Sequence, residues 1–562
     1  MKLVRDNHDV LVIIAIFVTG LLLFGASFNH PFHFDDVLIT NDANVVNAGH
    51  FFHFFNPLHL RQLTFFTFYL NHLAGGGNPG GYHMVNVILH IANAILLYVL
   101  LSAFFERWIA TAAAAMFLIH PIQTEPVLYI YQRSILLACF FSLLALIALF
   151  MQPRSRPWLA AVLFLCAFES KEAALAVPLV VAGICVTTNR RYRIALAAGV
   201  LVLAVAALGV LAYRNEQTVG IKAAGQVGPI AYFMTETRVF YTYVRLLFFP
   251  YPQSLEYEFA GNASFLPLLG ICALAGTAWV LWRRESWRIP AGCIFTFLLF
   301  LAPTSSFIPS LDLAFEHRLY LAMLPFSLFV AYLLSKVPGR SAITVILLCA
   351  LALLTIRRET VWASNVTLWE DTVRHAPGKA RAWFNLGGAY MNVDPEKART
   401  AFLNALELRP DFVEAWYDLG IIEQQKGHAE AAISYYQHAI EMDRSYWQAW
   451  NNAAITLLGM GNREAALRNF EQTLALNPDC WPAQYNIGVI DFMSARYSEA
   501  AARFKIALDW SPDFRDARYG LAMSYGRLGA TGDANEEWKK LGVNAIESRH
   551  APQALLTPAA PR

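Results

Sequence analysis

Charged residues are scarce in this chain. Asp, Glu, Lys and Arg together make up 15% of its 562 residues, hydrophobic residues make up 57%, and the mean hydropathy is +0.40. Because soluble domains carry about 25% charged residues, this composition excludes an ordinary soluble protein over most of the length and indicates a membrane protein. The net charge is only +2 and the basic residues fall in small clusters, which argues against a nucleic-acid partner.

Cysteines are also few, and their positions form no recognisable framework. Six of the seven lie in apolar segments and only Cys480 lies outside them, so neither a disulfide framework nor a CxxC metal site is expected. The sequence contains no nucleotide-binding loop, zinc motif, nucleophile elbow or dinucleotide fingerprint. The function must therefore be sought in the apolar segments and in the charges between them.

Long apolar segments dominate residues 1–357. Hydropathy predicts about eleven membrane helices, several of them shorter than the roughly 20 residues that cross a bilayer. The predicted spans are 10–28, 83–104, 108–120, 134–151, 157–168, 173–187, 193–213, 263–282, 289–302, 318–335 and 341–357. The apolar stretch 230–249 carries Glu236, Arg238 and Arg245, so it is predicted to be interfacial or re-entrant instead.

Short loops rich in Arg and Lys alternate along the predicted spans. The positive-inside rule makes these loops cytoplasmic, with the N-terminus inside and everything after the last span outside. They contain Lys2 and Arg5, Arg107, Arg154 and Arg156, Arg190 to Arg193, Arg283 to Arg288, and Lys336 and Arg340. Nearly every acidic residue of the membrane half then lies on the opposite, outer side, which includes a long aromatic-rich loop, 29–82.

Charges from five outer connections are expected at one membrane boundary. Asp35 and Asp36 follow the first span, where an ionisable pair is a functional hypothesis by default. The others are Glu125, Arg133, Glu169, Lys171, Glu172, Asp312, Glu316 and Arg318. Solvated loop ends are the plain alternative. The mixture of signs favours a site, because an anionic lipid phosphate needs cations and proton transfer needs a carboxylate.

A 34-residue period marks the second half of the chain. The positions that recur are Ala415, Ala449, Ala483 and Ala517; Tyr436, Phe470 and Phe504; and Pro410, Pro478 and Pro512. Small residues where helices touch, an aromatic residue in the second helix and a proline after it are typical of tetratricopeptide repeats. The chain is thus predicted to be all-α, with a connecting helix in 358–378, an α-solenoid over 379–547 and a disordered tail, 548–562.

Six motifs occur in an order that matches a known family. They are Phe34-Asp35-Asp36; Arg61-Gln62-Leu63-Thr64 with His83 to His90; His120-Pro121-Ile122-Gln123-Thr124-Glu125 with Arg133; Lys171-Glu172; Glu316-His317-Arg318-Leu319-Tyr320; and Leu368-Trp369-Glu370-Asp371. With these motifs the chain resembles the transmembrane and tetratricopeptide-repeat-containing O-mannosyltransferases (TMTC-like), of the GT-C glycosyltransferase superfamily. It departs from the family at Gln62, where a proline is usual, and over 214–262, which matches poorly.

The resemblance implies a reaction and assigns roles to residues. It implies transfer of a sugar, often mannose, from a polyprenyl-phosphate carrier to Ser or Thr hydroxyls of exported protein, with inversion, on the non-cytoplasmic face. Asp35 would be the general base, with Asp36 as its partner or the alternative. The proposed donor-phosphate ligands are Arg133, Lys171 and Arg318, and the supporting residues are Glu125, Glu172, Glu316 and Arg61. For Glu125 and Glu316, bracing the loops is an equal alternative.

The remaining expectations concern metal, acceptor and location. A divalent metal is left open, because paired carboxylates bind such ions. The solenoid is expected to recruit the acceptor polypeptide, and the acceptor-groove candidates are Trp416, Trp450, Asn451 and Asn486. A position in the repeat core is the alternative for the two tryptophans.

The expected location is the bacterial inner (plasma) membrane with the repeats outside the cytoplasm, or the ER membrane in a eukaryote. The rival function is a non-catalytic, membrane-anchored repeat scaffold for an envelope or secretion complex. An anchor needs one helix, however, and eleven are predicted.

Overall fold

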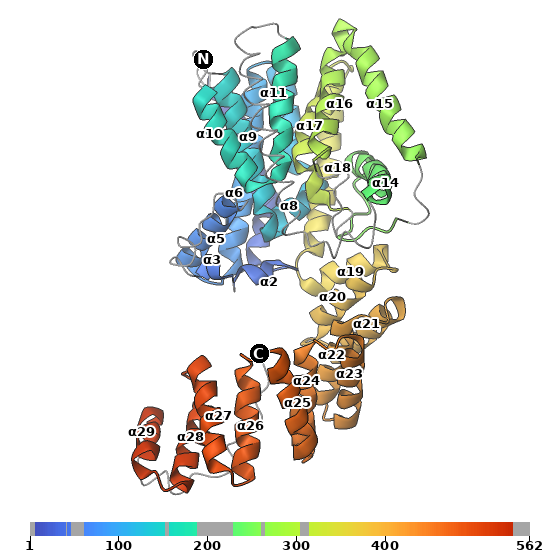
Figure 1. Cartoon of the computed structure of the whole chain (residues 1–562). Coiled ribbons are helices and arrows are strands. Elements are labelled where there is room, and N and C mark those ends of the chain that lie inside the picture. Colours follow the sequence, from blue (N-terminus) through green and yellow to red (C-terminus); the bar gives the residue numbers. More distant parts are fainter. Residues whose placement is uncertain are drawn as a thin grey trace. The chain divides into compact units, whose positions relative to one another are not determined.

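Helices form all the regular structure that the computed structural model describes. The described residues are 6–40, 42–46, 61–151, 157–187, 229–259, 265–303 and 314–542. The chain divides into two compact units, residues 1–376 and 377–562, whose helices are labelled in Figure 1.

Apolar helices make up the first unit. Five segments are long and apolar enough to cross a membrane: Asn7–Asn29, Pro79–Ser102, Ile130–Phe150, Glu316–Leu334 and Arg340–Val361. They correspond to α1 (Asn7–Phe24) with η1 (Gly25–Asn29), α6 (Pro79–Ser102), η3 (Ile130–Gln132) with α9 (Arg133–Phe150), η6 (Glu316–Arg318) with α17 (Leu319–Leu334), and α18 (Arg340–Val361).

Shorter apolar helices fill the remaining predicted spans. They are α7 (Arg107–Ile119), α10 (Pro157–Ser170), α11 (Ala176–Thr187), α15 (Leu266–Trp282) and α16 (Arg288–Leu301). Every predicted span that falls on described residues coincides with a helix. The predicted span 193–213 lies outside the described residues, so the count of eleven stays a prediction.

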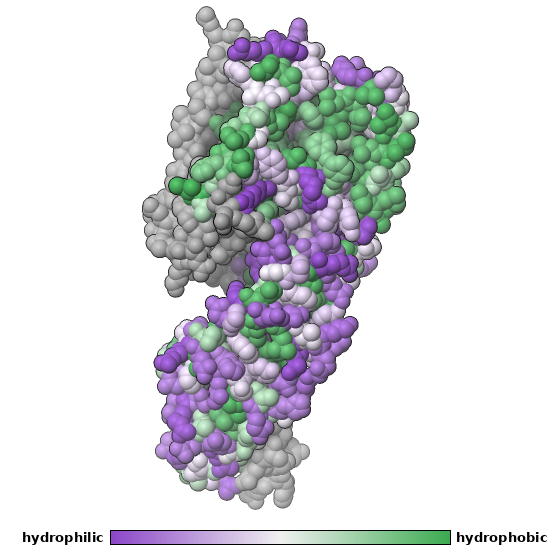
Figure 2. All heavy atoms as spheres, turned by 90° about the vertical axis from the view of Figure 1, so that its right-hand side faces the viewer, coloured by the Kyte–Doolittle hydropathy of each residue, from purple (hydrophilic) through white to green (hydrophobic). Residues whose placement is uncertain are grey.

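The surface of the first unit carries an apolar band. Figure 2 shows this band on the side that bears α15, with hydrophilic residues at its edges. Leu266, Leu269 and Trp279 of α15 are 74%, 64% and 58% exposed. Exposing such side chains to water costs about 25 cal/mol per Å², whereas a bilayer accepts them, so the surface is that of a membrane protein.

Loops that were predicted to share the cytoplasmic side meet at one end of this unit. Arg107, the first residue of α7, pairs with Asp6 at 2.6 Å and with Asp9 at 3.6 Å. Arg340, the first residue of α18, pairs with Glu106 at 3.5 Å. Three connections with the same predicted sidedness are thus neighbours in space.

Short elements gather at the other end of α1 and α6. They are α2 (Asp36–Ile39), α3 (Ala43–Val46), α5 (Gln62–Gly75), η2 (Pro121–Gln123), α8 (Thr124–Leu128), η4 (Glu172–Leu175) and α19 (Asn365–His375). The predicted interfacial segment forms α14 (Pro229–Phe248), which Figure 1 shows nearly end-on while α15 and α16 are seen lengthwise.

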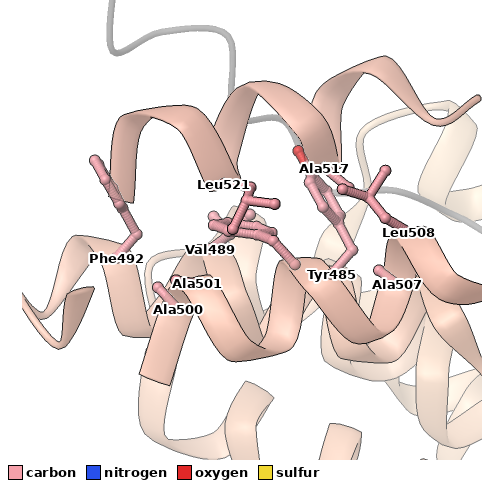
Figure 3. Close-up of a cluster of buried hydrophobic side chains, with 10 residues drawn as sticks. Tyr485, Val489, Phe492, Ala500, Ala501, Ala507, Leu508, Ala517 and Leu521 are labelled. Atoms are coloured by element: carbon pink, nitrogen blue, oxygen red, sulfur yellow. The ribbon is translucent and has the colours of Figure 1, made fainter. Parts of the chain in front are cut away.

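Five helix pairs form the described part of the second unit, which extends to residue 542. They are α20 (Ala380–Tyr390) with α21 (Pro395–Leu408), α22 (Val413–Gln425) with α23 (Ala429–Met442), α24 (Trp447–Gly459) with α25 (Arg463–Leu476), α26 (Trp481–Met493) with α27 (Tyr497–Trp510), and α28 (Arg515–Arg527) with α29 (Thr531–Leu541). Figure 3 shows how neighbouring repeats join: Tyr485 and Val489 of α26 pack with Ala507 of α27 and Leu521 of α28. The predicted repeat solenoid is confirmed.

The tight turn inside four of the five repeats, all but the first, explains part of the 34-residue period. Gly427, Gly461 and Gly529 occupy it with φ of 80°, 83° and 76°, a left-handed conformation that only glycine adopts without strain. Ala495 stands at the same point of its repeat with φ of 58°. The repeat therefore imposes this conformation even where the side chain opposes it.

Candidate active site

Asp35 is the more accessible member of the acidic pair. It precedes α2, is half-buried, and its Oδ2 accepts a hydrogen bond of 3.0 Å from the Tyr129 hydroxyl. Burial raises the pKa of the Tyr129 phenol, and the charges of Asp35 and Asp36 raise it further. Tyr129 is therefore a neutral donor that serves Asp35.

Asp36 is fully buried and binds backbone. Its Oδ2 accepts from the N–H of His33 (3.1 Å) and Ile130 (3.2 Å), and its Oδ1 accepts from the N–H of Tyr131 (2.7 Å). Burial raises the pKa of Asp36 to about 8, and these three N–H groups oppose that rise. Because Asp36 has no exposed surface, its place is structural: it ties the start of α2 to η3.

The turn before Asp35 is strained and held from two sides. Phe34 has a φ of 50°, and left-handed backbone at a non-glycine residue persists only where the surroundings enforce it. Its ring packs against Tyr129 and Trp369, with centroids 6.0 and 5.7 Å apart. Trp369 belongs to the predicted Leu368-Trp369-Glu370-Asp371 motif, so that motif helps to shape the Asp35 turn.

The turn is also docked onto the start of α19. The Nδ1 atom of His33 lies 2.8 Å from Asn365 Oδ1, and Asn365 Nδ2 donates to the Phe32 carbonyl at 3.1 Å. Burial lowers the pKa of His33 to about 4, which keeps this imidazole neutral. Asn365 thus contacts two consecutive residues, Phe32 and His33, of the segment that leads into Asp35.

Arg133 lies fully buried among neutral acceptors. Its Nε donates to Asn86 (2.8 Å), its Nη1 to Thr67 (3.2 Å) and Asn71 (2.6 Å), and its Nη2 to the Tyr82 carbonyl (3.0 Å). The guanidinium also lies 4.5 Å from the Phe68 ring centroid. This arrangement joins α5, α6 and α9 and leaves no exposed edge for a phosphate.

Lys171 lies where several charges converge. Its Nζ donates to Gln132 Oε1 at 2.7 Å. Burial lowers the pKa of Lys171 to about 7 and Arg61 lowers it further, whereas Glu172 and Glu125 raise it; Arg318 contributes a smaller lowering. Three predicted cations, from three separate segments, therefore act on one another at this point.

Arg61 is the most exposed of these cations. Its side chain is 35% exposed and lies 3.7 Å from Glu172. The Glu169 carboxylate accepts the N–H groups of Gln62 and Leu63 at 2.5 and 2.9 Å, as a carboxylate does at a helix N-terminus. Glu169 thereby fixes the start of α5 and, with it, the position of Arg61.

Glu125 and Glu316 brace loops. Glu125 accepts the Glu316 N–H at 2.7 Å and shares a 2.7 Å hydrogen bond with His317 Nδ1. Glu316 accepts from Gln253 Nε2 (2.7 Å), the Ser254 N–H (3.3 Å) and the Tyr257 hydroxyl (2.5 Å). Both carboxyls are fully buried, and burial together with the Glu316 charge raises the pKa of Glu125 to about 8. Of the two alternatives for this pair, the geometry favours bracing.

Two further charged residues belong to this region although the sequence analysis did not predict them as site residues. Glu236, on α14, pairs with Arg318 at 3.1 Å. Arg358, near the end of α18, pairs with Asp371 at 2.8 Å and is 6% exposed. Their only sequence signal was a charge inside an otherwise apolar stretch, which for Glu236 was read as a sign of an interfacial helix.

The acceptor-groove candidates are engaged within the repeats. The indole N–H of Trp416 donates to the Pro410 carbonyl at 2.9 Å, and that of Trp450 to the Arg444 carbonyl at 3.1 Å. Each tryptophan thus clamps the turn six residues before it. Asn451 and Asn486 are fully buried. Their role in acceptor binding stays a prediction, and the geometry favours the core alternative for the two tryptophans.

Metal ligands do not cluster in the described part of the chain. Among those residues, no group of three or more His, Cys, Asp or Glu side chains is arranged to hold a metal ion.

Comparison with known proteins finds both halves of the predicted resemblance. The family model for the tetratricopeptide repeat matches residues 393–449 and 451–493. Protein O-mannosyl-transferase F38B6.6 of Caenorhabditis elegans is 25% identical over 63% of this chain and 54% of its own length. Protein O-mannosyl-transferase TMTC3 of Mus musculus is 24% identical over 64% of this chain and 45% of its own. Tmtc1 of Drosophila melanogaster, also named a protein O-mannosyl-transferase, is 37% identical over 22% and 15%.

The chain therefore spans about half the length, or less, of the curated relatives it matches. The predicted resemblance to the TMTC-like O-mannosyltransferases is confirmed.

Proposed function

We propose that this protein is a membrane glycosyltransferase. It moves a hexose, with mannose as the first candidate, from a polyprenyl-phosphate carrier to Ser or Thr hydroxyls of exported protein, on the non-cytoplasmic face. One observation carries the proposal: a single short segment, Tyr129 to Gln132, makes hydrogen bonds to both a carboxylate and a cation. Tyr129 donates to Asp35, and three residues later Gln132 accepts from Lys171. The names of the relatives support the same reaction class.

Asp35 acts as the general base in this proposal. It takes the proton of the acceptor hydroxyl, the hydroxyl oxygen attacks the anomeric carbon, and the bond from that carbon to the phosphate oxygen breaks. The electron pair leaves with the phosphate, and a single displacement of this kind inverts the anomeric centre. A positioned base contributes about 10²- to 10⁴-fold in rate.

Lys171, Arg61 and Arg318 bind the donor phosphate. They stabilise the negative charge that the leaving phosphate gains. Glu172 and Glu236 orient Arg61 and Arg318 through the two ion pairs.

Arg133 and Asp36 take positioning roles in this proposal, because both are fully buried and engaged with protein partners. The repeat unit recruits the acceptor polypeptide, in line with the ability of such solenoids to bind other chains.

Intact-mass glycoproteomics of exported proteins tests the proposal. Cells carry the wild-type chain, Asp35→Asn, Lys171→Met, Lys336→Met or a deletion, and the membrane level of each protein is measured. Lys336 is an exposed lysine of the predicted cytoplasmic side and is the matched control for Lys171. We expect hexose-modified Ser and Thr peptides to vanish with Asp35→Asn and the deletion, to fall strongly with Lys171→Met, and to persist with Lys336→Met. Unchanged glycans in the deletion, together with defective envelope assembly, would instead identify the scaffold.

A further inference from the structure

A buried tyrosine makes a hydrogen bond to the first member of the acidic pair. Tyr129 is 3% exposed, and its hydroxyl donates to Asp35 Oδ2 at 3.0 Å. Its ring stacks on Tyr131, with centroids 6.4 Å apart, and contacts the strained Phe34. The phenol is therefore buried against two aromatic rings, and its hydroxyl donates to the carboxylate that the proposed reaction needs.

The two residues that follow Tyr129 in the chain are also held in place. The N–H groups of Ile130 and Tyr131 bind Asp36, so η3 holds both neighbouring carboxyls: Asp36 by backbone and Asp35 by a side chain. The ionisable groups whose charges act on Tyr129 are Asp35, Asp36 and Glu125. Of these three carboxyl groups, Asp35 accepts the hydrogen bond of the Tyr129 hydroxyl.

We propose that Tyr129 is a positioning residue that orients Asp35 and favours its ionised form through the hydroxyl hydrogen bond. This inference rests on the proposed role of Asp35 as the base. A hydrogen bond donated to a carboxylate stabilises the charged form relative to the protonated form, and it restricts the carboxylate to one orientation. Both effects matter because a protonated or rotated Asp35 cannot accept the proton of the acceptor hydroxyl.

The test is the pH profile of kcat/KM for full-length protein reconstituted in vesicles. Radiolabelled mannosyl-phosphoryl-polyprenol is the donor, and exported proteins from deletion cells are the acceptor. Tyr129→Phe removes one oxygen atom and keeps the ring. We expect it to move the acidic limb of the profile upward by about one pH unit, the size that corresponds to one hydrogen bond to a charged group.

Tyr98→Phe is the matched control. Tyr98 is 1% exposed and its hydroxyl donates to Asp9 Oδ1 at 2.7 Å, so it loses the same kind of buried contact. Asp9 lies near the start of α1, whereas Asp35 follows the end of η1, and a helix of that length separates them by about 30 Å. We expect Tyr98→Phe to lower the unfolding temperature without moving the acidic limb.

A second variant tests the inference if Tyr129→Phe fails to fold. 3-Fluorotyrosine at position 129 keeps the hydroxyl and makes it a stronger donor, so the acidic limb should move to lower pH. An unmoved limb in Tyr129→Phe or in the fluorinated protein overturns the inference, as does an equal shift in Tyr98→Phe. If Asp35→Asn abolishes transfer while the Tyr129 variants keep the wild-type limb, only this inference fails. If Asp35→Asn retains full activity, the proposed base fails as well.

Discussion

Asp35 and Asp36 should respond to the same substitution in opposite ways. The two residues are adjacent, yet Asp36 accepts three backbone N–H groups on two oxygens while Asp35 accepts a hydroxyl. Replacement by Asn leaves one acceptor oxygen, because the amide nitrogen accepts no hydrogen bond. In its best orientation, Asn at position 36 keeps its oxygen at the place of Oδ2 and accepts the N–H groups of His33 and Ile130. The N–H group of Tyr131 then has no acceptor.

The expected loss of stability follows from this unpaired Tyr131 N–H group. A buried donor without a partner costs about 1–3 kcal/mol, so Asp36→Asn should lower the free energy of unfolding by about that amount. Asp35→Asn keeps an oxygen for the Tyr129 hydroxyl, so its stability should change by less than about 0.5 kcal/mol. Its transfer rate should nevertheless fall by about 10²- to 10⁴-fold, because the base is gone.

The pH dependence of stability provides a second test of this prediction. Burial raises the folded-state pKa of Asp36 to about 8, above the value of about 3.9 for an unfolded Asp. The folded protein thus holds a proton that the unfolded chain releases, so this contribution to stability is full below about pH 4 and is lost as the pH rises through about 8. Asn cannot titrate, and the gap between wild type and Asp36→Asn should therefore be larger at pH 5 than at pH 8.

Circular dichroism of unfolding in detergent micelles, at pH 5 and pH 8, measures the stability of each variant. Transfer assays on the same preparations measure the activity. The reasoning would be refuted by wild-type stability of Asp36→Asn at pH 5, or by an Asp35→Asn protein that folds and transfers sugar at the wild-type rate.

Three further predictions concern the repeats and the cation cluster. Gly387 and Gly388 are adjacent on α20: a Cβ at Gly387 would lie 2.5 Å from the Phe402 ring, whereas a Cβ at Gly388 meets nothing within 4 Å. Gly388→Ala should therefore stabilise the repeats by up to about 1 kcal/mol, and Gly387→Ala should be about 1–3 kcal/mol worse than Gly388→Ala; native-state hydrogen exchange of α20 in the full chain measures both, and equal effects would contradict the packing argument. Ala495→Gly should raise the stability of its repeat by about 0.5–1 kcal/mol, because it relieves left-handed backbone, and slower exchange in α26 and α27 is the readout; faster exchange would count against it. Because the pKa of Lys171 is lowered to about 7, its ammonium loses its charge as the pH rises through about 7. Donor binding should weaken there, and kcat/KM for the donor should fall. Lys171→Arg should abolish this alkaline limb of the pH profile, and an unaltered limb would show that Lys171 is not part of the phosphate site.

Local patterns were enough to predict most of the architecture. The 34-residue period and the apolar runs are properties of short stretches, because each repeat and each membrane helix satisfies its own backbone hydrogen bonds. The same patterns located the charged connections, which the structure brings together around Lys171. The period even held at Ala495, where the repeat imposes the glycine conformation.

Only the tertiary structure decided which role each charged residue takes. Asp35 and Asp36 are alike in sequence, and so are Arg133 and Arg318. Burial and binding partners distinguish them, and most of those partners lie 47 to 95 residues away in the sequence. Arg133 is enclosed by neutral acceptors from α5 and α6, whereas Arg318 pairs with Glu236 of α14. Tyr129 lay between the motif that ends at Glu125 and Arg133 as an unremarked aromatic residue, because a hydroxyl gains a role only when folding places a carboxylate 3.0 Å from it.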